Sequence, residues 1–124
     1  MEYAEVFSRL TYETAIVVFM KKNGDVRLML GTRNLSTVNL KYGWRAVELG
    51  GHDRRCNIQN GNIAIFDMLV DGVRSFNIDR LVTVQFLGEI KTLEELDAAA
   101  EKFVEFKAEY EKTQPSEISM DNLD

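Results

Sequence analysis

The string His52-Asp53-Arg54-Arg55-Cys56 holds the only histidine and the only cysteine of the chain, two residue types that bind metals and catalyse nucleophilic reactions. A histidine and a cysteine supply at most two zinc ligands, whereas zinc needs four, or three and a water. A nucleophilic cysteine would need a further group to orient the histidine, and none is evident. Paired catalytic carboxylates are also missing, and Gly50-Gly51 lacks the lysine and the spacing of a phosphate-binding loop. We therefore expect no enzyme activity, no cofactor and no metal.

The segment around this string is the locally basic part of the chain. Residues 32–61 contain six potential cations against two acids, together with a tyrosine and a tryptophan. Such aromatic rings can stack on unpaired bases while arginines contact phosphates. The same mixture is typical of protein–protein hot spots, and the tryptophan could instead pack against one end of the domain. These alternatives stay open for the binding residues predicted here: Tyr42, Trp44, Arg45, His52, Arg54 and Arg55.

The formal charge of −5 is unevenly distributed along the 124 residues. Residues 1–90 carry a net charge of +1, residues 91–112 carry −3 and residues 113–124 carry another −3. An acidic C-terminal part repels phosphates, so it argues against indiscriminate nucleic-acid binding by the whole molecule. A local basic face remains compatible with this charge, and the acidic part could equally contact a basic partner.

The regular elements that must position these side chains are mainly strands. Residues 14–20 and 26–30 flank Asn23-Gly24, the strongest short hairpin signal, and a second hairpin is expected around Asp71-Gly72 within residues 62–78. Asp79-Arg80 then links to a strand over residues 81–87, and residues 44–49 could add one more. Five or six short strands with hairpin connections are typical of a small barrel or of two packed sheets.

Helices are expected only outside this β-rich part. Residues 1–13 allow a short amphipathic helix, and Thr92 to Glu95 read as a capping box that opens an acidic helix over residues 91–112. Its apolar stripe, which includes Leu93, Leu96 and Phe103, would pack on the barrel or on a second subunit. The lone proline ends this helix, so residues 113–124 are predicted to form a disordered acidic tail.

Two segments resemble a known family. Val17 to Arg27 resembles the opening hairpin of small phage-encoded SH3-like β-barrel proteins. Arg74, Phe76 and Arg80, followed by a leucine, are similar to the Arg-x-Phe-x-x-x-Arg-hydrophobic signature of WYL-type domains, which are related to Sm-like barrels. The resemblance covers residues 15–88; the chain lacks a helix-turn-helix and a Trp-Tyr-Leu run.

This resemblance implies a five-stranded barrel from a bacterial virus. WYL-type domains are thought to sense nucleotide or nucleic-acid ligands, and Sm-like barrels bind RNA, often as rings. By similarity, Arg74 and Arg80 would face the ligand, with Phe76 structural between them. The residues alone offer another interpretation, because a strand places Arg74 beside apolar groups. A guanidinium there needs either an anionic ligand or an acid partner, which Asp67 or Asp79 could supply.

We therefore expect a mainly β protein with a C-terminal helix. An SH3-like or Sm-like β-barrel of five or six strands would span residues 14–90, with a long loop over 32–61. The leading hypothesis is a non-enzymatic phage accessory protein that binds a host or phage protein in the cytoplasm of the infected bacterium. The alternative is nucleic-acid or nucleotide binding through the basic loop, Arg74 and Arg80. Self-association through the helix stripe is also possible, and no membrane segment is expected.

Overall fold

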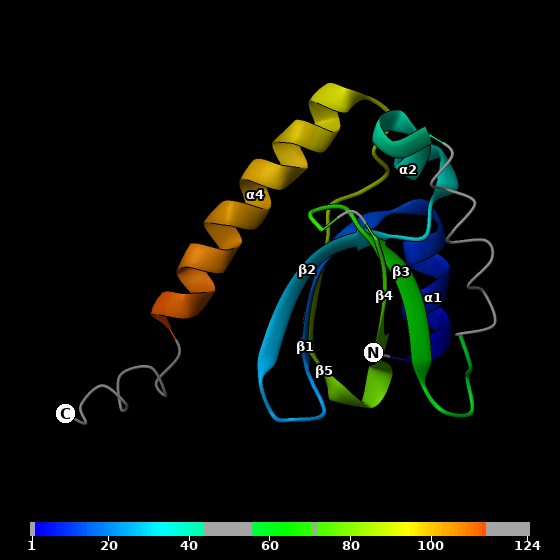
Figure 1. Cartoon of the computed structure of the whole chain (residues 1–124), viewed down its shortest axis with the longest axis vertical. Coiled ribbons are helices and arrows are strands. Elements are labelled where there is room, and N and C mark those ends of the chain that lie inside the picture. Colours follow the sequence, from blue (N-terminus) through cyan, green and yellow to red (C-terminus); the bar gives the residue numbers. More distant parts are fainter. Residues whose placement is uncertain (1, 44–55, 71, 114–124) are drawn as a thin grey trace.

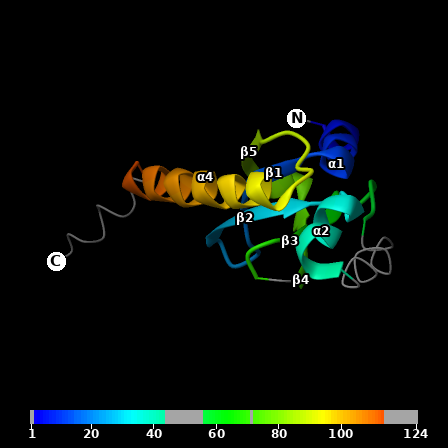
Figure 2. The same cartoon turned by 90° about the horizontal axis from the view of Figure 1, so that it is seen from above.

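The computed structural model describes residues 2–43, 56–70 and 72–113. They form a five-stranded antiparallel sheet with helices on both faces (Figures 1 and 2). The predicted strand over residues 44–49 and the predicted tail after residue 113 lie outside the described residues. So do five predicted binding residues: Trp44, Arg45, His52, Arg54 and Arg55.

The strands are β1 (Thr14–Met20), β2 (Val26–Thr32), β3 (Asn62–Asp67), β4 (Gly72–Asn77) and β5 (Leu81–Phe86). Their order in the sheet is β4-β3-β2-β1-β5, and all neighbours are antiparallel. A closed barrel would need a ladder between the outer strands β4 and β5, and none is found among the described residues. The short 3-10 helix η3 (Ile78–Arg80) connects the outer strands β4 and β5, and β5 then pairs with β1 and not with β4. The prediction of five or six strands is therefore confirmed as a five-stranded antiparallel sheet. Closure of this sheet into a barrel is not found among the described residues.

Both predicted hairpins are present. Gly24 takes a φ of +94° in the first turn, where the amide of Lys21 donates to the carbonyl of Asp25 at 2.7 Å. Glycine adopts that left-handed conformation without steric cost, which explains its place in the turn. In the second hairpin, β3 and β4 pair in continuous register over six residue pairs.

One face of the sheet packs on helix α1 (Tyr3–Tyr12), the short N-terminal helix that the sequence predicted. Val6 and Leu10 are fully buried on its inner side. They contact inward-facing side chains of four strands, which are Ala15, Val17, Phe19, Met29, Ile63, Ile65 and Phe76. We call this cluster the α1 core.

The opposite face packs on helix α2 (Leu35–Tyr42) and on the long helix α4 (Leu93–Lys112). Strand β1 is buried from Thr14 to Phe19, because helices cover both of its faces, and this explains its unbroken apolar run. The cluster on this face is called the α4 core; its buried members are Ile16, Leu30, Val38, Phe66, Met68, Ile90, Leu96, Ala99 and Phe103.

Helix α4 begins as predicted, with the Thr92 hydroxyl accepting from the Glu95 amide at 3.1 Å. The Glu95 carboxylate accepts in turn from the amide of Lys91, so two backbone donors are satisfied at the helix start. Of the stripe expected to mediate contacts, Leu96 and Phe103 are buried on the sheet and Leu93 stays half-exposed. The stripe therefore packs within the chain, and self-association remains a prediction that light scattering can check.

The segment expected to be a long loop, residues 32–61, contains helix α2 and is therefore not irregular throughout. The Asn34 side chain caps this helix by accepting from the amides of Ser36 and Thr37. The helix has only eight residues, and its β-branched Thr37 and Val38 weaken the helical signal in the sequence. Tertiary contacts hold it instead, because Val38 is buried and the Thr37 hydroxyl donates to the Ile90 carbonyl at 2.8 Å.

Strands β2 and β3 approach each other closely at Gly31. A Cβ at this position would clash with the Ile65 side chain and would lie 3.2 Å from the carbonyl oxygen of Phe66. Glycine therefore allows β3 to pair with β2 at this point. Among the described residues, no helix is long and apolar enough to cross a membrane.

Candidate functional site

Arg74 lies on the edge strand β4, opposite Ile65 of β3, with an exposed side chain. The predicted ion pair with Asp67 or Asp79 is not formed. Between described residues, the salt bridge that the structure contains is Arg9–Glu13, at 2.9 Å. Phe76, two residues further along β4, is buried as the resemblance implied. Arg74 is therefore available to solvent at the sheet edge, and its predicted role in ligand binding stays a prediction.

Asp67 is a buried carboxyl group at the end of β3, where it accepts from the amide of Leu69 at 3.1 Å. Burial raises the pKa of Asp67 above its ordinary value. Amides of the following turn and the charges of Arg74 and Arg27 oppose this shift without cancelling it. The ionised carboxylate is thus less favourable in the folded chain than in water.

Asp67→Asn is expected to leave the chain at least as stable as the wild type at neutral pH, since Asn keeps the oxygen acceptor and carries no charge to desolvate. Because the pKa of Asp67 is raised in the folded state, its contribution to folding stability is complete below the unfolded-state pKa of 3.8. That contribution is lost as the pH rises through the folded-state pKa. The stability difference in favour of Asn should therefore grow with pH across that window. Urea unfolding at several pH values measures it.

A matched Asp67→Ala variant removes the acceptor as well as the charge, and it should be less stable than Asp67→Asn by about 1 kcal/mol. An Asn variant that is less stable than the wild type at neutral pH, and equal to it at low pH, would contradict the desolvation argument.

Arg80, the second arginine of the predicted signature, lies in η3 (Ile78–Arg80), and its Nη1 donates to the carbonyl of Lys21 at 3.3 Å. It lines a cavity of about 370 Å³ where β1, β3 and β4 meet η3. Three cations and no acid line this cavity. We call it the cationic pocket; its lining residues are Phe19, Met20, Lys21, Lys22, Asn62, Ser75, Phe76, Asn77 and Arg80. Arg74 does not line it, so the structure separates the two predicted arginines.

Lys21 and Lys22 were not among the predicted binding residues. In the sequence they stand directly before the Asn-Gly turn, and the pattern there indicates a hairpin and not a binding site. A pair of adjacent lysines beside a tight hairpin turn is a usable sign of a basic loop. Their neighbour across the fold is 59 positions away in the chain, however, and only the strand order places Arg80 beside them.

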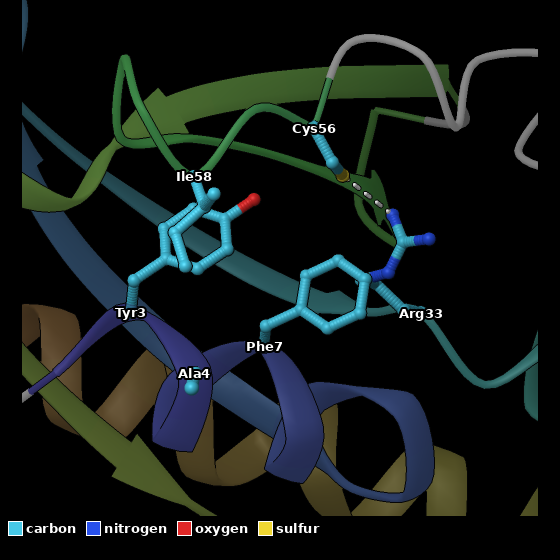
Figure 3. Close-up of a pocket in the computed structure, with 6 residues that line it drawn as sticks. All are labelled: Tyr3, Ala4, Phe7, Arg33, Cys56 and Ile58. Atoms are coloured by element: carbon cyan, nitrogen blue, oxygen red, sulfur yellow. Dashed lines mark hydrogen bonds between the residues drawn. The ribbon is translucent and has the colours of Figure 1, made fainter.

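A second cavity, of about 440 Å³, lies between α1 and the segment that precedes β3 (Figure 3). The rings of Tyr3 and Phe7 stack with centroids 5.9 Å apart, and the Tyr3 hydroxyl donates to the carbonyl of Asn62. Ile58, which is 66% exposed, also lines this cavity. We call this the aromatic pocket, lined by Tyr3, Ala4, Phe7, Arg33, Cys56 and Ile58.

Arg33 and Cys56 form the polar side of the aromatic pocket (Figure 3). The Cys56 sulfur accepts from Nη1 of Arg33 and from the amide of Ala64, both at 3.2 Å. The Arg33 guanidinium also lies 4.6 Å from the centroid of the Phe7 ring, a cation–π distance. Burial raises the pKa of the Tyr3 phenol above its ordinary value; Cys56 adds to the shift and Arg33 opposes it.

This arrangement holds the Cys56 side chain in place by hydrogen bonds. His52, its partner in the metal and nucleophile interpretations, lies outside the described residues. No cluster of three or more metal-ligating side chains occurs within residues 2–43, 56–70 and 72–113. The chemistry that the aromatic pocket offers is contact with an apolar group, since its walls are a tyrosine, a phenylalanine and an isoleucine.

Tyr42, the remaining predicted binding residue, contributes to the α4 core. Its ring packs against Phe66 with centroids 5.0 Å apart, and its hydroxyl donates to the carbonyl of Met68 at 2.7 Å. These contacts give Tyr42 a structural role in joining α2 to β3. A role in binding stays a prediction.

The chain places an N-terminal helix ahead of five antiparallel strands. The model of the family described as WYL_2, Sm-like SH3 beta-barrel fold, matches residues 4–82. The chain belongs to the WYL_2 family. This match runs from α1 into β5, so it includes the residues that line both pockets except Tyr3, and it leaves α4 outside. No curated protein and no solved structure matches the chain.

Proposed function

We propose that this WYL_2-family chain is a non-enzymatic phage accessory protein that binds and modulates a host or phage protein in the cytoplasm of the infected bacterium. The observation that supports this function best is the aromatic pocket on α1. It offers stacked rings and an exposed isoleucine on the surface of a small domain. Pockets of this kind accept an apolar side chain of a partner, and aromatic residues are enriched at the energetic centres of such interfaces.

The position of the aromatic pocket in the chain adds to this proposal. Cys56 follows directly on residues 44–55, which carry five of the predicted binding residues. An apolar anchor on the partner is thus the feature that fits the rings of Tyr3 and Phe7 and the exposed Ile58 best.

Ile58→Glu tests this function, because it places a carboxylate at the entrance of the aromatic pocket without disturbing a buried group. A matched control is Val104→Glu, which makes the same type of change on α4 at an exposed fraction of 65%, against 66% for Ile58. The wild type and each variant are immobilised and used to capture proteins from the lysate of the phage-infected host. The wild type and Val104→Glu should both retain one partner at a near-stoichiometric level. Ile58→Glu is expected to lower its recovery about tenfold or more.

Equal recovery by the two variants would contradict the role of the aromatic pocket. Circular dichroism of both variants checks whether a loss of partner recovery is caused by unfolding.

Nucleic-acid or nucleotide binding is the second candidate function, and the cationic pocket specifically favours it. Three basic side chains meet there without a lining acid, although the whole chain carries a charge of −5. Phosphate binding by such a group would weaken steeply as the salt concentration rises. A salt titration of the affinity for a single-stranded oligonucleotide tests this function, and binding without salt dependence would argue against it.

A further inference from the structure

Lys21 joins two neighbouring cavities of the chain. It lines the cationic pocket, and it also lines a groove of about 540 Å³ between the β1–β2 hairpin and the last turns of α4. We call this second cavity the hairpin groove; its lining residues are Lys21, Asp25, Val26, Arg27, Leu28, Lys107 and Glu111. The carbonyl of Lys21 accepts from Arg80, and its amide donates to the carbonyl of Asp25, so the two cavities adjoin at this residue.

Basic side chains line both cavities. We call this set the basic path; it consists of Lys107, Arg27, Lys21, Lys22 and Arg80. Two acids, Asp25 and Glu111, line the same cavities, so five positive charges stand against two negative ones. The salt bridge that the structure contains between described residues is Arg9–Glu13, so the basic path forms no ion pair within the described part of the chain. Its excess charge therefore favours an anionic occupant.

The segment that follows α4 carries the opposite charge. Residues 114–124 contain Glu117, Asp121 and Asp124 but no basic residue, which gives a net charge of −3. Helix α4 runs toward the end of the sheet that carries the β1–β2 turn (Figure 1). It ends at Lys112, directly after the groove-lining Glu111. The chain therefore leaves α4 beside the hairpin groove, with acidic residues following.

The length of residues 114–124 is sufficient for contact with both cavities. A segment of this length extends over at most about 36 Å. From the end of α4 it can follow the hairpin groove, which Lys107 and Glu111 line, to Lys21 and the cationic pocket. A segment tethered by so short a connection has an effective concentration in the millimolar range. Weak surface ion pairs are therefore enough to hold it.

The apolar side chains of this segment also have a matching surface. Ile118, Met120 and Leu123 are interspersed with its acids. Met20 lines the cationic pocket and Val26 lines the hairpin groove, and each is 42% exposed. An acidic segment with aliphatic side chains thus complements both the cations and the exposed apolar groups of the two cavities.

We propose that residues 114–124 bind along the basic path of their own chain and restrict the access of other anionic groups to the cationic pocket. The tether favours this occupant over a second copy, which would also bring a further charge of −5. The inference depends on neither candidate function. Exposed ion pairs add little to folding stability, so the test measures contact and not unfolding.

Carbodiimide cross-linking of the full chain at low ionic strength, with mass spectrometry of the monomer fraction, tests the proposal. The reagent joins carboxylates to lysines in contact with them. Cross-links from Asp121 and Asp124 to Lys21 or Lys22 should be about tenfold more frequent than cross-links to Lys102. Lys102 is the reference because it is exposed, lines neither cavity and lies only about 15 Å from the end of α4. Raising the salt concentration to about 0.5 M should bring this ratio close to one.

Arg27→Gln with Arg80→Gln removes two charges from the basic path and keeps the lysines that report contact. It is expected to lower the frequency of the Lys21 and Lys22 cross-links about threefold or more. The matched control is Arg74→Gln with Lys91→Gln, which removes the same charge from exposed residues outside both cavities and should change that frequency by less than about 1.5-fold. Arg27 is exposed, so Arg27→Gln alone repeats the test if the double variant unfolds.

Four results would overturn the proposal. Cross-links to Lys102 that are as frequent as those to Lys21 and Lys22 would show unselective contact. Equal losses in the two double variants would show a general charge effect. Cross-links confined to dimers would assign the basic path to the segment of a second copy, and a lack of cross-links to Lys21 and Lys22 would show that the segment does not reach it. The two candidate functions would stand in each case, because the purified chain is tested without a partner.

Discussion

A chain that ends at Lys91 is expected to lose most of its folding stability. Removing α4 takes Leu96, Ala99 and Phe103 out of the α4 core and exposes the sheet residues that they cover. Burial of the leucine and the phenylalanine alone contributes about 5 kcal/mol. Natural domains have a net stability of about 5–15 kcal/mol, so the shortened chain should be largely unfolded or close to unfolding. Urea unfolding followed by circular dichroism measures the difference.

A chain that ends at Thr113 is the control, since it keeps all of α4 (Figure 2). It should unfold at the same urea concentration as the full chain. Unchanged stability of the chain that ends at Lys91 would show that α4 is an appendage and not part of the core. The prediction also affects functional experiments: a deletion of residues 92–124 removes acidic charge and part of the core together, so it cannot separate protein binding from nucleic-acid binding.

Phe66→Ala is expected to destabilise the chain by about 3–5 kcal/mol. Phe66 is fully buried on the α4 face of β3, where its ring contacts Tyr42 of α2. Alanine would leave a cavity between the sheet and two helices, and that cavity adds to the lost transfer free energy. The free energy of unfolding in urea gives the size of the effect.

Phe106→Ala makes the same change on α4 at a half-buried ring that stacks on Tyr110. It should cost clearly less than Phe66→Ala, by about 2 kcal/mol, because less apolar area returns to water. Comparable losses for the two variants would contradict the position of Phe66 at the centre of the α4 core.

The elements with strong local signals were predictable from the sequence. Asn23-Gly24 fixes its hairpin through backbone conformations that few residues adopt, and the Thr92 capping box fixes the start of α4. Helix α2 was missed because its stability comes from tertiary contacts, such as the Thr37 hydroxyl on the carbonyl of Ile90, 53 residues away. The absence of a ladder between β4 and β5 among the described residues could not be predicted either. Local sequence patterns indicate where strands lie, but they do not indicate which strand edges pair.

The candidate sites were harder to predict than the elements, because each joins segments that are distant in the chain. The aromatic pocket combines Tyr3 and Phe7 of α1 with Ile58, and in the sequence these two rings are simply the apolar side of a short helix. The cationic pocket contains the predicted Arg80, but its partner lysines precede a turn at the other end of the domain sequence. Composition alone cannot bring such side chains together; the antiparallel order of the strands does so.

The most direct test of the proposed function is affinity capture from the phage-infected host lysate with and without nuclease. We expect one protein to be retained at a near-stoichiometric level in both samples, and Ile58→Glu to reduce its recovery while Val104→Glu does not. That result would establish a protein partner bound at the aromatic pocket. Recovery of nucleic acid, with every protein lost after nuclease treatment, would contradict it and direct attention to the cationic pocket.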